Sequence, residues 1–274
     1  GVEVLNADVK ATIEGEFAGM SDANINGFRL RHANVVAKWQ NGISTLMGQA
    51  WHPQFIEECF PQTANINTGI PFNPFARSPQ IQLRYDIGKF HFQAAAVTQI
   101  DFMSTGPNGN SFLYMKNASM PELVGKIMFK TSDGNNNFLF GGTFAYKTLK
   151  PRLINSIGTK VNETISTKSA SVFAKYNNDK FAWKVSGIVG EDMYHLTMIG
   201  GYAVKMSNYG IISNIFENEL LYTPLISSSV WSDLVYGNRH QFGLFTGFSR
   251  NYGSNKNIFN WENTSSYFAR GQDI

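Results

Sequence analysis

Charged residues are scarce in this chain of 274 residues, where Asp, Glu, Lys and Arg together make up 16%. A typical soluble domain has about a quarter. Long hydrophobic runs are also missing: Ala94–Val97 is a typical longest stretch, far below the roughly 18 apolar residues of a membrane-spanning helix. The net charge of +3 is too small to indicate a nucleic-acid partner. The single cysteine, Cys59, excludes an intramolecular disulfide.

Recognisable enzyme and metal motifs are missing from the sequence as well. It contains no G-x-S-x-G, H-E-x-x-H or Walker loop. Cys59 has no identifiable activating partner, which predicts a buried or incidental thiol. The paired acids Glu57-Glu58 and Glu191-Asp192 are expected in solvated loops. The histidines show no ligand spacing; they are His32, His52, His91, His195 and His240. We therefore expect no enzyme activity, no cofactor and no metal.

What the sequence does contain is strict alternation of polar and apolar residues, clearest in 79–101. Two strands there are joined by Gly88-Lys89. The polar positions are Gln80, Gln82, Arg84, Asp86, His91, Gln93, Gln99 and Asp101. The apolar positions between them include Ile81, Leu83, Tyr85, Phe90 and Phe92. Because a strand turns successive side chains to opposite faces, this pattern predicts a sheet with one apolar and one polar face.

The same alternation predicts about 13 strands without a linker, and hence one domain over 1–274. The other strands are expected near 6–18, 27–39, 43–51, 121–131, 137–148, 165–177, 180–191, 199–206, 209–222, 226–236 and 239–250. Short turns at 41–42, 88–89, 132–136, 177–179, 207–208 and 237–238 alternate with long segments at 19–26, 52–78, 102–119 and 149–164. Such alternation is typical of outer-membrane barrels, with short periplasmic turns and long extracellular loops. The aromatic content of 14% and the low charge agree with a lipid-facing wall.

We therefore predict an all-β, transmembrane, antiparallel up-and-down barrel in the bacterial outer membrane. Single-chain bacterial barrels have even strand numbers, so the intact protein is expected to have 14–16 strands, possibly 16. The chain starts without a signal segment and ends without a recognisable closing strand, which suggests that terminal strands are missing. A barrel of 14 to 18 strands leaves an aqueous channel through its centre.

The longest segment, 52–78, is rich in proline and phenylalanine. Proline disfavours sheet, and loops of this length are usually functional or disordered. Its aromatic content argues for order. Two interpretations stay open: a loop folded into the lumen to narrow the pore, or an extracellular cap or contact with a neighbouring subunit.

Arginines on the polar faces are the best candidates for pore residues. Arg29, Arg31 and Arg84 are expected to point inward because their flanking residues are apolar. Inward arginines favour anions, and the guanidinium group suits bidentate contacts with carboxylates. The alternative is that these arginines only stiffen the wall by ion pairing. Candidate partners are Asp8, Glu14, Glu16, Asp86 and Asp101.

Several short motifs support this interpretation through a family resemblance. They are Phe28-Arg29-Leu30-Arg31-His32-Ala33, Leu46-Met47-Gly48-Gln49-Ala50-Trp51, Phe60-Pro61, Arg77-Ser78-Pro79-Gln80-Ile81-Gln82, Gln99-Ile100-Asp101, Tyr222-Thr223-Pro224 and Trp231-Ser232-Asp233. Over roughly residues 5–250 the chain resembles the DcaP-like porins of Gram-negative outer membranes, as a Bacteroidetes-like member. The resemblance implies a homotrimer that takes up small anions, dicarboxylates in particular, through an arginine-lined constriction.

Carried over to this chain, the resemblance adds Arg77 to the pore arginines and places Gln49 and Trp51 near the constricting loop. The complete set of expected pore-lining residues is Arg29, Arg31, Gln49, Trp51, Arg77, Gln80, Gln82, Arg84, Gln99 and Asp101. The predicted function is passive diffusion of small, preferentially anionic solutes across the outer membrane, with membrane lipid as the other partner. The alternatives are a soluble or periplasmic β-sheet binding protein and an outer-membrane barrel enzyme.

Overall fold

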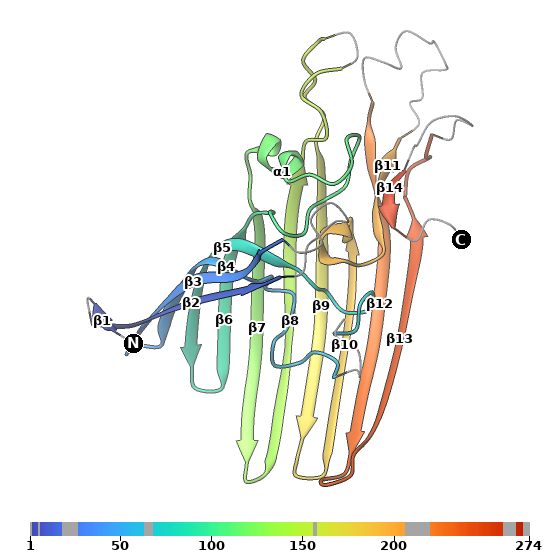
Figure 1. Ribbon diagram of the computed structural model, residues 1–274. Helices are drawn as coiled ribbons and strands as arrows, with labels where there is room; N and C mark the ends of the chain where they lie inside the picture. The colour runs from blue at the N-terminus through green and yellow to red at the C-terminus, as the bar shows by residue number, and fades with distance from the viewer. Residues whose placement is uncertain are drawn as a thin grey trace.

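The computed structural model describes residues 2–4, 6–17, 27–62, 68–155, 158–205, 220–259 and 267–270. In these residues the chain forms a 14-stranded antiparallel sheet with very little helix (Figure 1). The helical elements are α1 (Leu113–Ala118) and the 3-10 turn η2 (Tyr194–Leu196). The strands are β1 (Val2–Val4), β2 (Ala7–Glu16), β3 (Arg29–Trp39), β4 (Ile43–Trp51), β5 (Arg77–Ile87), β6 (Phe90–Val97), β7 (Glu122–Asp133), β8 (Asn136–Leu149), β9 (Ile165–Asn177), β10 (Phe181–Glu191), β11 (Gly200–Val204), β12 (Tyr222–Tyr236), β13 (Phe242–Gly253) and β14 (Tyr267–Arg270).

The strands follow one another as a meander. Each strand from β1 to β9 pairs with its successor, β10 pairs with β12, and β12 pairs with β13. β11 pairs with the first residues of β12, and β14 pairs with β11. The predicted all-β, antiparallel, up-and-down arrangement is therefore confirmed. In the described residues β1 and β13 each pair on one side only, so the sheet is not closed there.

Most of the predicted strands are present within a few residues of their expected bounds. The exceptions have simple reasons. β1 and β14 were not expected, because three or four residues are too few to show alternation. The strand predicted at 226–236 is the second part of the longer β12. The strand predicted at 209–222, the turn at 207–208 and the loop at 19–26 lie entirely or mostly outside the described residues.

Short turns lie at one end of the long strands and long connections at the other, as predicted (Figure 1). The turn at Asn41-Gly42 illustrates why the chain reverses there. Gly42 has a φ of 82°, a conformation that costs glycine little, and the Asn41 Oδ1 accepts a hydrogen bond of 3.1 Å from the Ile43 N–H. The Asn-Gly pair thus forms the tight hairpin between β3 and β4.

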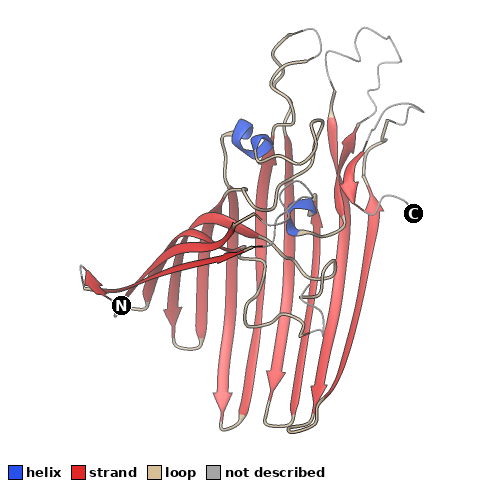
Figure 2. Cartoon of the chain, viewed as in Figure 1, coloured by secondary structure: helices blue, strands red, loops and turns tan. Residues whose placement is uncertain are grey.

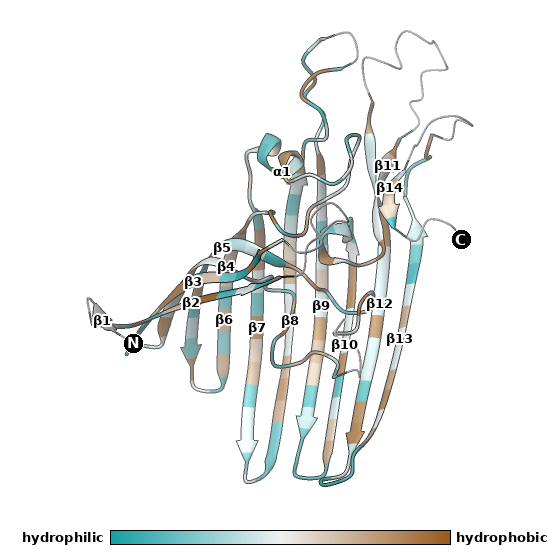
Figure 3. Cartoon of the chain, viewed as in Figure 1, coloured by the Kyte–Doolittle hydropathy of each residue, from teal (hydrophilic) through white to brown (hydrophobic). Residues whose placement is uncertain are grey.

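One face of the sheet exposes large apolar side chains. They alternate along the strands, as the bands of hydropathy in Figure 3 show, and include Leu83, Ile127, Phe140, Val172 and Leu244, each more than half exposed. Soluble monomers rarely expose contiguous apolar patches larger than a few hundred Å². This face therefore fits an apolar environment such as lipid. No helix in the described part of the chain is long and apolar enough to span a membrane.

The opposite face is polar and is covered by loops (Figure 2). The described parts of segment 52–76, called the inner loop below, lie across it. Gln54 in the loop donates hydrogen bonds to Thr143 on β8 (3.2 Å) and Ser169 on β9 (3.0 Å). Farther along the sheet, the Trp231 Nε1 on β12 donates to the Asn73 Oδ1 (3.1 Å). The inner loop thus bridges the polar face from β8 to β12, as the lumen interpretation predicts.

The largest core cluster lies between this loop and the sheet. Ile56 and Cys59 from the inner loop pack with Met128, Leu139 and Trp231, which come from β7, β8 and β12. Phe173 on β9 belongs to the same cluster. A single-layered sheet has no core of its own, so the inner loop supplies the second layer.

The position of Cys59 yields a test of this packing. Its side chain is buried, and burial raises the pKa of the thiol from 9.0 to about 11, which reduces the thiolate by about 100-fold at neutral pH. We expect folded protein to resist iodoacetamide and urea-unfolded protein to react. Ser132→Cys in a Cys59→Ala background, at the exposed end of β7, is the control and should react in both states. Rapid alkylation of Cys59 in folded protein would contradict the packed loop.

Candidate pore site

A β-bulge places two arginines on the polar face. In the pairing of β2 with β3, Glu14 faces His32 and Gly15 faces Leu30, so that Arg31 is the extra residue. Glu16 then faces Arg29. Because a bulge shifts the alternation by one residue, Arg29 and Arg31 share the inner side with His32. The inward direction expected for both arginines is therefore reached through a bulge that the alternation alone does not reveal.

Each of the three arginines of this region forms ion pairs with acids. Arg29 makes a bidentate contact with Asp101, with Nε–Oδ1 and Nη2–Oδ2 distances of 2.8 Å each. The Arg77 Nε lies 3.2 Å from the Asp101 Oδ2. Arg31 contacts Glu14 (3.1 Å) and Glu16 (3.2 Å). Three arginines and three acids leave this ion-pair cluster, formed by Arg29, Arg31, Arg77, Glu14, Glu16 and Asp101, without net formal charge.

Aromatic rings cover the ion-pair cluster. The Arg77 guanidinium lies 5.2 Å from the centroid of the Trp51 ring, and the Arg29 guanidinium lies 5.3 Å from that of Phe102. Trp51 in turn stacks on Phe55 of the inner loop, with ring centroids 4.4 Å apart. Cation–π contacts strengthen when they are shielded from water. The cluster thus joins β2, β3 and β5 to the loops at 52–76 and 98–121.

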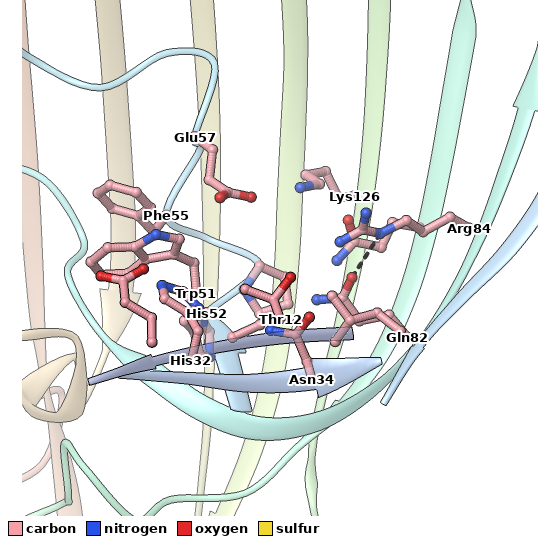
Figure 4. Close-up of a pocket in the computed structure, with 15 residues that line it drawn as sticks. Thr12, His32, Asn34, Trp51, His52, Phe55, Glu57, Gln82, Arg84 and Lys126 are labelled. Atoms are coloured by element: carbon pink, nitrogen blue, oxygen red, sulfur yellow. Dashed lines mark hydrogen bonds between the residues drawn. The ribbon is translucent and has the colours of Figure 1, made fainter. Parts of the chain in front are cut away.

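Beside this cluster lies a cavity of about 350 Å³ on the inner side of the sheet (Figure 4). Arg84 on β5 and Lys126 on β7 enter it from the wall, while Glu57 extends toward them from the inner loop. No carboxylate in the described residues lies within ion-pair distance of Arg84 or Lys126. The cavity is lined further by Thr12, Glu14, His32, Asn34, Leu46, Ala50, Trp51, His52, Pro53, Phe55, Gln82 and Gln93.

Arg84 is held by a ladder of glutamines along β5. Its Nε donates to the Gln82 Oε1 at 2.8 Å, the dashed line in Figure 4. The Gln82 Nε2 donates to the Gln80 Oε1 (2.7 Å), and the Gln80 Nε2 donates to the Ala50 and Trp51 carbonyls (3.0 and 2.9 Å). These contacts leave the Arg84 charge without a counter-ion while fixing its direction.

The ten expected pore residues fall into three groups. Trp51, Gln82 and Arg84 line the cavity. Arg29, Arg31, Arg77 and Asp101 belong to the ion-pair cluster, as the wall-stiffening alternative allowed. Gln49, Gln80 and Gln99 are engaged elsewhere. Gln49 bonds the Leu30 carbonyl of β3 (2.7 Å), and Gln99 bonds Ser104 within its own loop (3.1 Å).

Sequence reasoning missed two charged groups of the cavity, Lys126 and Glu57. Lys126 falls within the predicted strand 121–131 on the same side as Glu122 and Lys130, and these charged neighbours could have marked it as inward-facing. Glu57 was expected in a solvated loop. Its side chain is exposed, but it is exposed to the cavity. Its pKa is raised because the surrounding protein partly desolvates it and Glu58 adds a second negative charge. The approach of the loop to the wall is set by tertiary packing, which the sequence does not display.

A second cluster lies behind the cavity and is buried. The Glu122 Oε2 on β7 lies 3.4 Å from the Nε2 of His52 and 3.0 Å from the Nε2 of His195. Lys147 and Asp192 adjoin it, with a Nζ–Oδ2 distance of 2.8 Å. Sequence spacing could not reveal this group, because its histidines and Glu122 come from three distant segments. Two imidazoles and a carboxylate are donors that divalent metals accept.

Comparison with known proteins gives two solved structures as neighbours. The first is OmpT (in-vitro folded), an outer membrane protein of Vibrio cholerae in trimer form, with a TM-score of 0.47 at 9% identity over 91% of this chain and 67% of that chain. The second is outer-membrane expressed OmpT of Vibrio cholerae, with a TM-score of 0.42 at 10% identity over 90% and 75%. No family model and no curated protein matches. Membership of the DcaP-like porins stays a prediction.

Proposed function

We propose that this protein is an outer-membrane porin through which small polar solutes diffuse passively, without a chemical step. The observation that carries the proposal is that one sheet has an apolar face and, opposite it, a polar face. The outer face exposes large apolar side chains, and the inner face holds a water-accessible cavity between wall cations and the inner loop. A barrel in lipid needs both faces, whereas a soluble sheet would have to cover the apolar one.

The proposal includes a preference for anions, such as dicarboxylates, and assigns it to Arg84 and Lys126. Arg29, Arg31 and Arg77 are neutralised by their partners and contribute little field to the cavity. Arg84 and Lys126 lack such partners in the described residues and face the carboxylate of Glu57, while the other carboxylate that lines the cavity, that of Glu14, is paired with Arg31. Selectivity in pores follows the charge on the lining, so an excess of cations favours anions. The homotrimer expected from the family resemblance belongs to the same proposal.

Planar-bilayer recording of detergent-refolded protein tests the proposal. We expect stepwise conductance and a reversal potential that favours chloride over potassium in a salt gradient. A preference for cations would contradict the assigned anion selectivity but would still agree with a channel. Absence of conductance from a protein that stays monodisperse without detergent would overturn the porin proposal and favour the soluble binding protein.

Glu57 makes the selectivity dependent on pH. Because its pKa is raised, the carboxylate takes up a proton at a higher pH than an ordinary glutamate, and the cavity then loses its facing negative charge. We expect the preference for anions to increase as the pH is lowered below neutral. Reversal potentials recorded across this range measure the effect. Glu57→Gln should show the higher preference already at neutral pH and lack the increase; an unchanged pH profile in this variant would assign the effect to another group.

A further inference from the structure

The buried cluster at His52, Glu122 and His195 has the composition and spacing of a metal site. The two Nε2 atoms and the Glu122 oxygen all lie within 4.8 Å of one another. Metal–ligand bonds of about 2.0–2.2 Å place neighbouring ligand atoms roughly 3.0–3.5 Å apart. The distances of 3.0 and 3.4 Å from the Glu122 Oε2 to the two histidines match this spacing.

The same contacts are poor hydrogen bonds. Although both distances are short, none of these three atoms has a hydrogen bond of acceptable geometry in the described part of the chain. All three side chains are nearly inaccessible to solvent. Buried polar atoms without partners are costly and rare in native proteins. Ligand atoms that face a common point between them, rather than one another, explain why the distances are short although hydrogen-bond geometry is not met.

We propose that His52, Glu122 and His195 bind one divalent first-row transition ion of the Zn²⁺ type. Two imidazoles and one carboxylate suit such an ion better than Ca²⁺ or Mg²⁺, which prefer all-oxygen sites. The burial of the site leaves no path for a substrate, so the ion has a structural role. It joins the inner loop through His52 and the segment after β10 through His195 to the wall strand β7.

Buried polar groups surround the site. The Nδ1 of His195 lies 2.9 Å from the Lys147 Nζ, and this Nζ also lies 2.8 Å from the carbonyl oxygen and 2.8 Å from the Oδ2 of Asp192. Outer groups of this kind orient imidazoles that bind a metal. An ion bound to the Nε2 of His52 leaves the ring proton on Nδ1. Nδ1 then no longer accepts the long hydrogen bond of 3.3 Å from the Gln54 N–H.

The test is metal analysis of the full chain after refolding in detergent and treatment with EDTA. Because it needs no conductance measurement, failure of the metal-site proposal can be distinguished from failure of the porin proposal. The probe is ZnCl₂, followed by desalting and elemental analysis. We expect one equivalent of zinc per folded chain, bound more tightly as the pH rises because the ligands must be deprotonated. CoCl₂ should give a visible absorption from cobalt bound by the two imidazoles and the carboxylate.

Two variants and one control make the test specific. Glu122→Gln removes the anionic ligand at nearly constant volume and should no longer bind the one equivalent of zinc. His52→Cys keeps a ligand atom and should retain zinc, with a new thiolate-to-cobalt absorption in the cobalt form. His91→Asn is the control, since His91 contacts Asp86 (2.7 Å) away from the cluster, and it should bind as the parent does.

Folding of each variant is checked by heat-dependent mobility in gel electrophoresis, and only folded variants are compared. Two results would overturn the metal site: no stoichiometric zinc in the folded parent chain, or full binding in folded Glu122→Gln. If Glu122→Gln fails to fold, the cobalt spectrum of His52→Cys decides alone. A thiolate band then supports the site, and its absence contradicts it.

Discussion

Replacement of Asp101 by Asn is expected to lower the free energy of unfolding by about 3 kcal/mol, the lower end of the range for breaking a buried ion pair. Asp101 binds two arginines at once, Arg29 through two 2.8 Å contacts and Arg77 through one of 3.2 Å. The Arg77 side chain is only 3% exposed, so it cannot recover hydration when its partner is lost. Asn keeps the shape and one acceptor, which confines the change to the charge.

Urea unfolding in detergent, followed by tryptophan fluorescence, measures this loss. Asp86→Asn is the matched control: Asp86 lies on the same sheet, its side chain is 43% exposed, and its contact with His91 should contribute less than about 1 kcal/mol. The double variant Arg77→Gln with Asp101→Asn should be less destabilised than the sum of the two single variants, because it also removes the cation that has lost its nearer partner and keeps only the 3.7 Å contact with Glu16. Additive losses would show that the contact carries no coupling energy.

Neutralisation of Arg84 and Lys126 is expected to produce the largest change in selectivity. One unit charge about 5 Å from a permeating ion in water changes the free energy of that ion by about 0.8 kcal/mol, and because the sign is opposite for chloride and potassium their permeability ratio changes by roughly 16-fold. Arg84→Ala and Lys126→Ala should each reduce the preference for anions by about that factor. The double variant should approach the product, because the two acids that remain in the lining are Glu57 and the Arg31-paired Glu14.

Reversal potentials in bilayers at low and high salt measure the effect, which should shrink at high salt because the charges are screened. Lys89→Ala removes a cation in the exposed turn between β5 and β6 and should leave selectivity unchanged. Arg31→Gln distinguishes the cavity cations from the ion-pair cluster: it exposes the charge of Glu14 and Glu16 and is expected to change selectivity less than Arg84→Ala. A larger effect at Arg31 would move the selectivity determinant to the ion-pair cluster.

The residues that form the wall of the candidate site could be predicted from the sequence better than the ion pairs that set its charge. Arg84 and Gln82 were found because they fall on the polar side of an alternating strand, a period that local sequence displays directly. Arg29 and Arg31 were also expected on that side, but their partners were not resolved among five candidate acids. Pairing depends on the bulge at Arg31 and on the approach of Asp101 from a separate loop, 72 residues away in sequence from Arg29.

By itself, the sequence determined the all-β class, the order of most strands, the alternation of short and long connections and the polarity of each face. These follow from a period of two and from turn residues such as Asn41-Gly42, which act over a few residues. The tertiary structure alone decided which cations lack a counter-ion, that Glu57 faces Lys126, and that His52 and His195 meet at Glu122. These are contacts between segments far apart in the chain. They arise when the inner loop packs on the sheet, and no local pattern encodes that meeting.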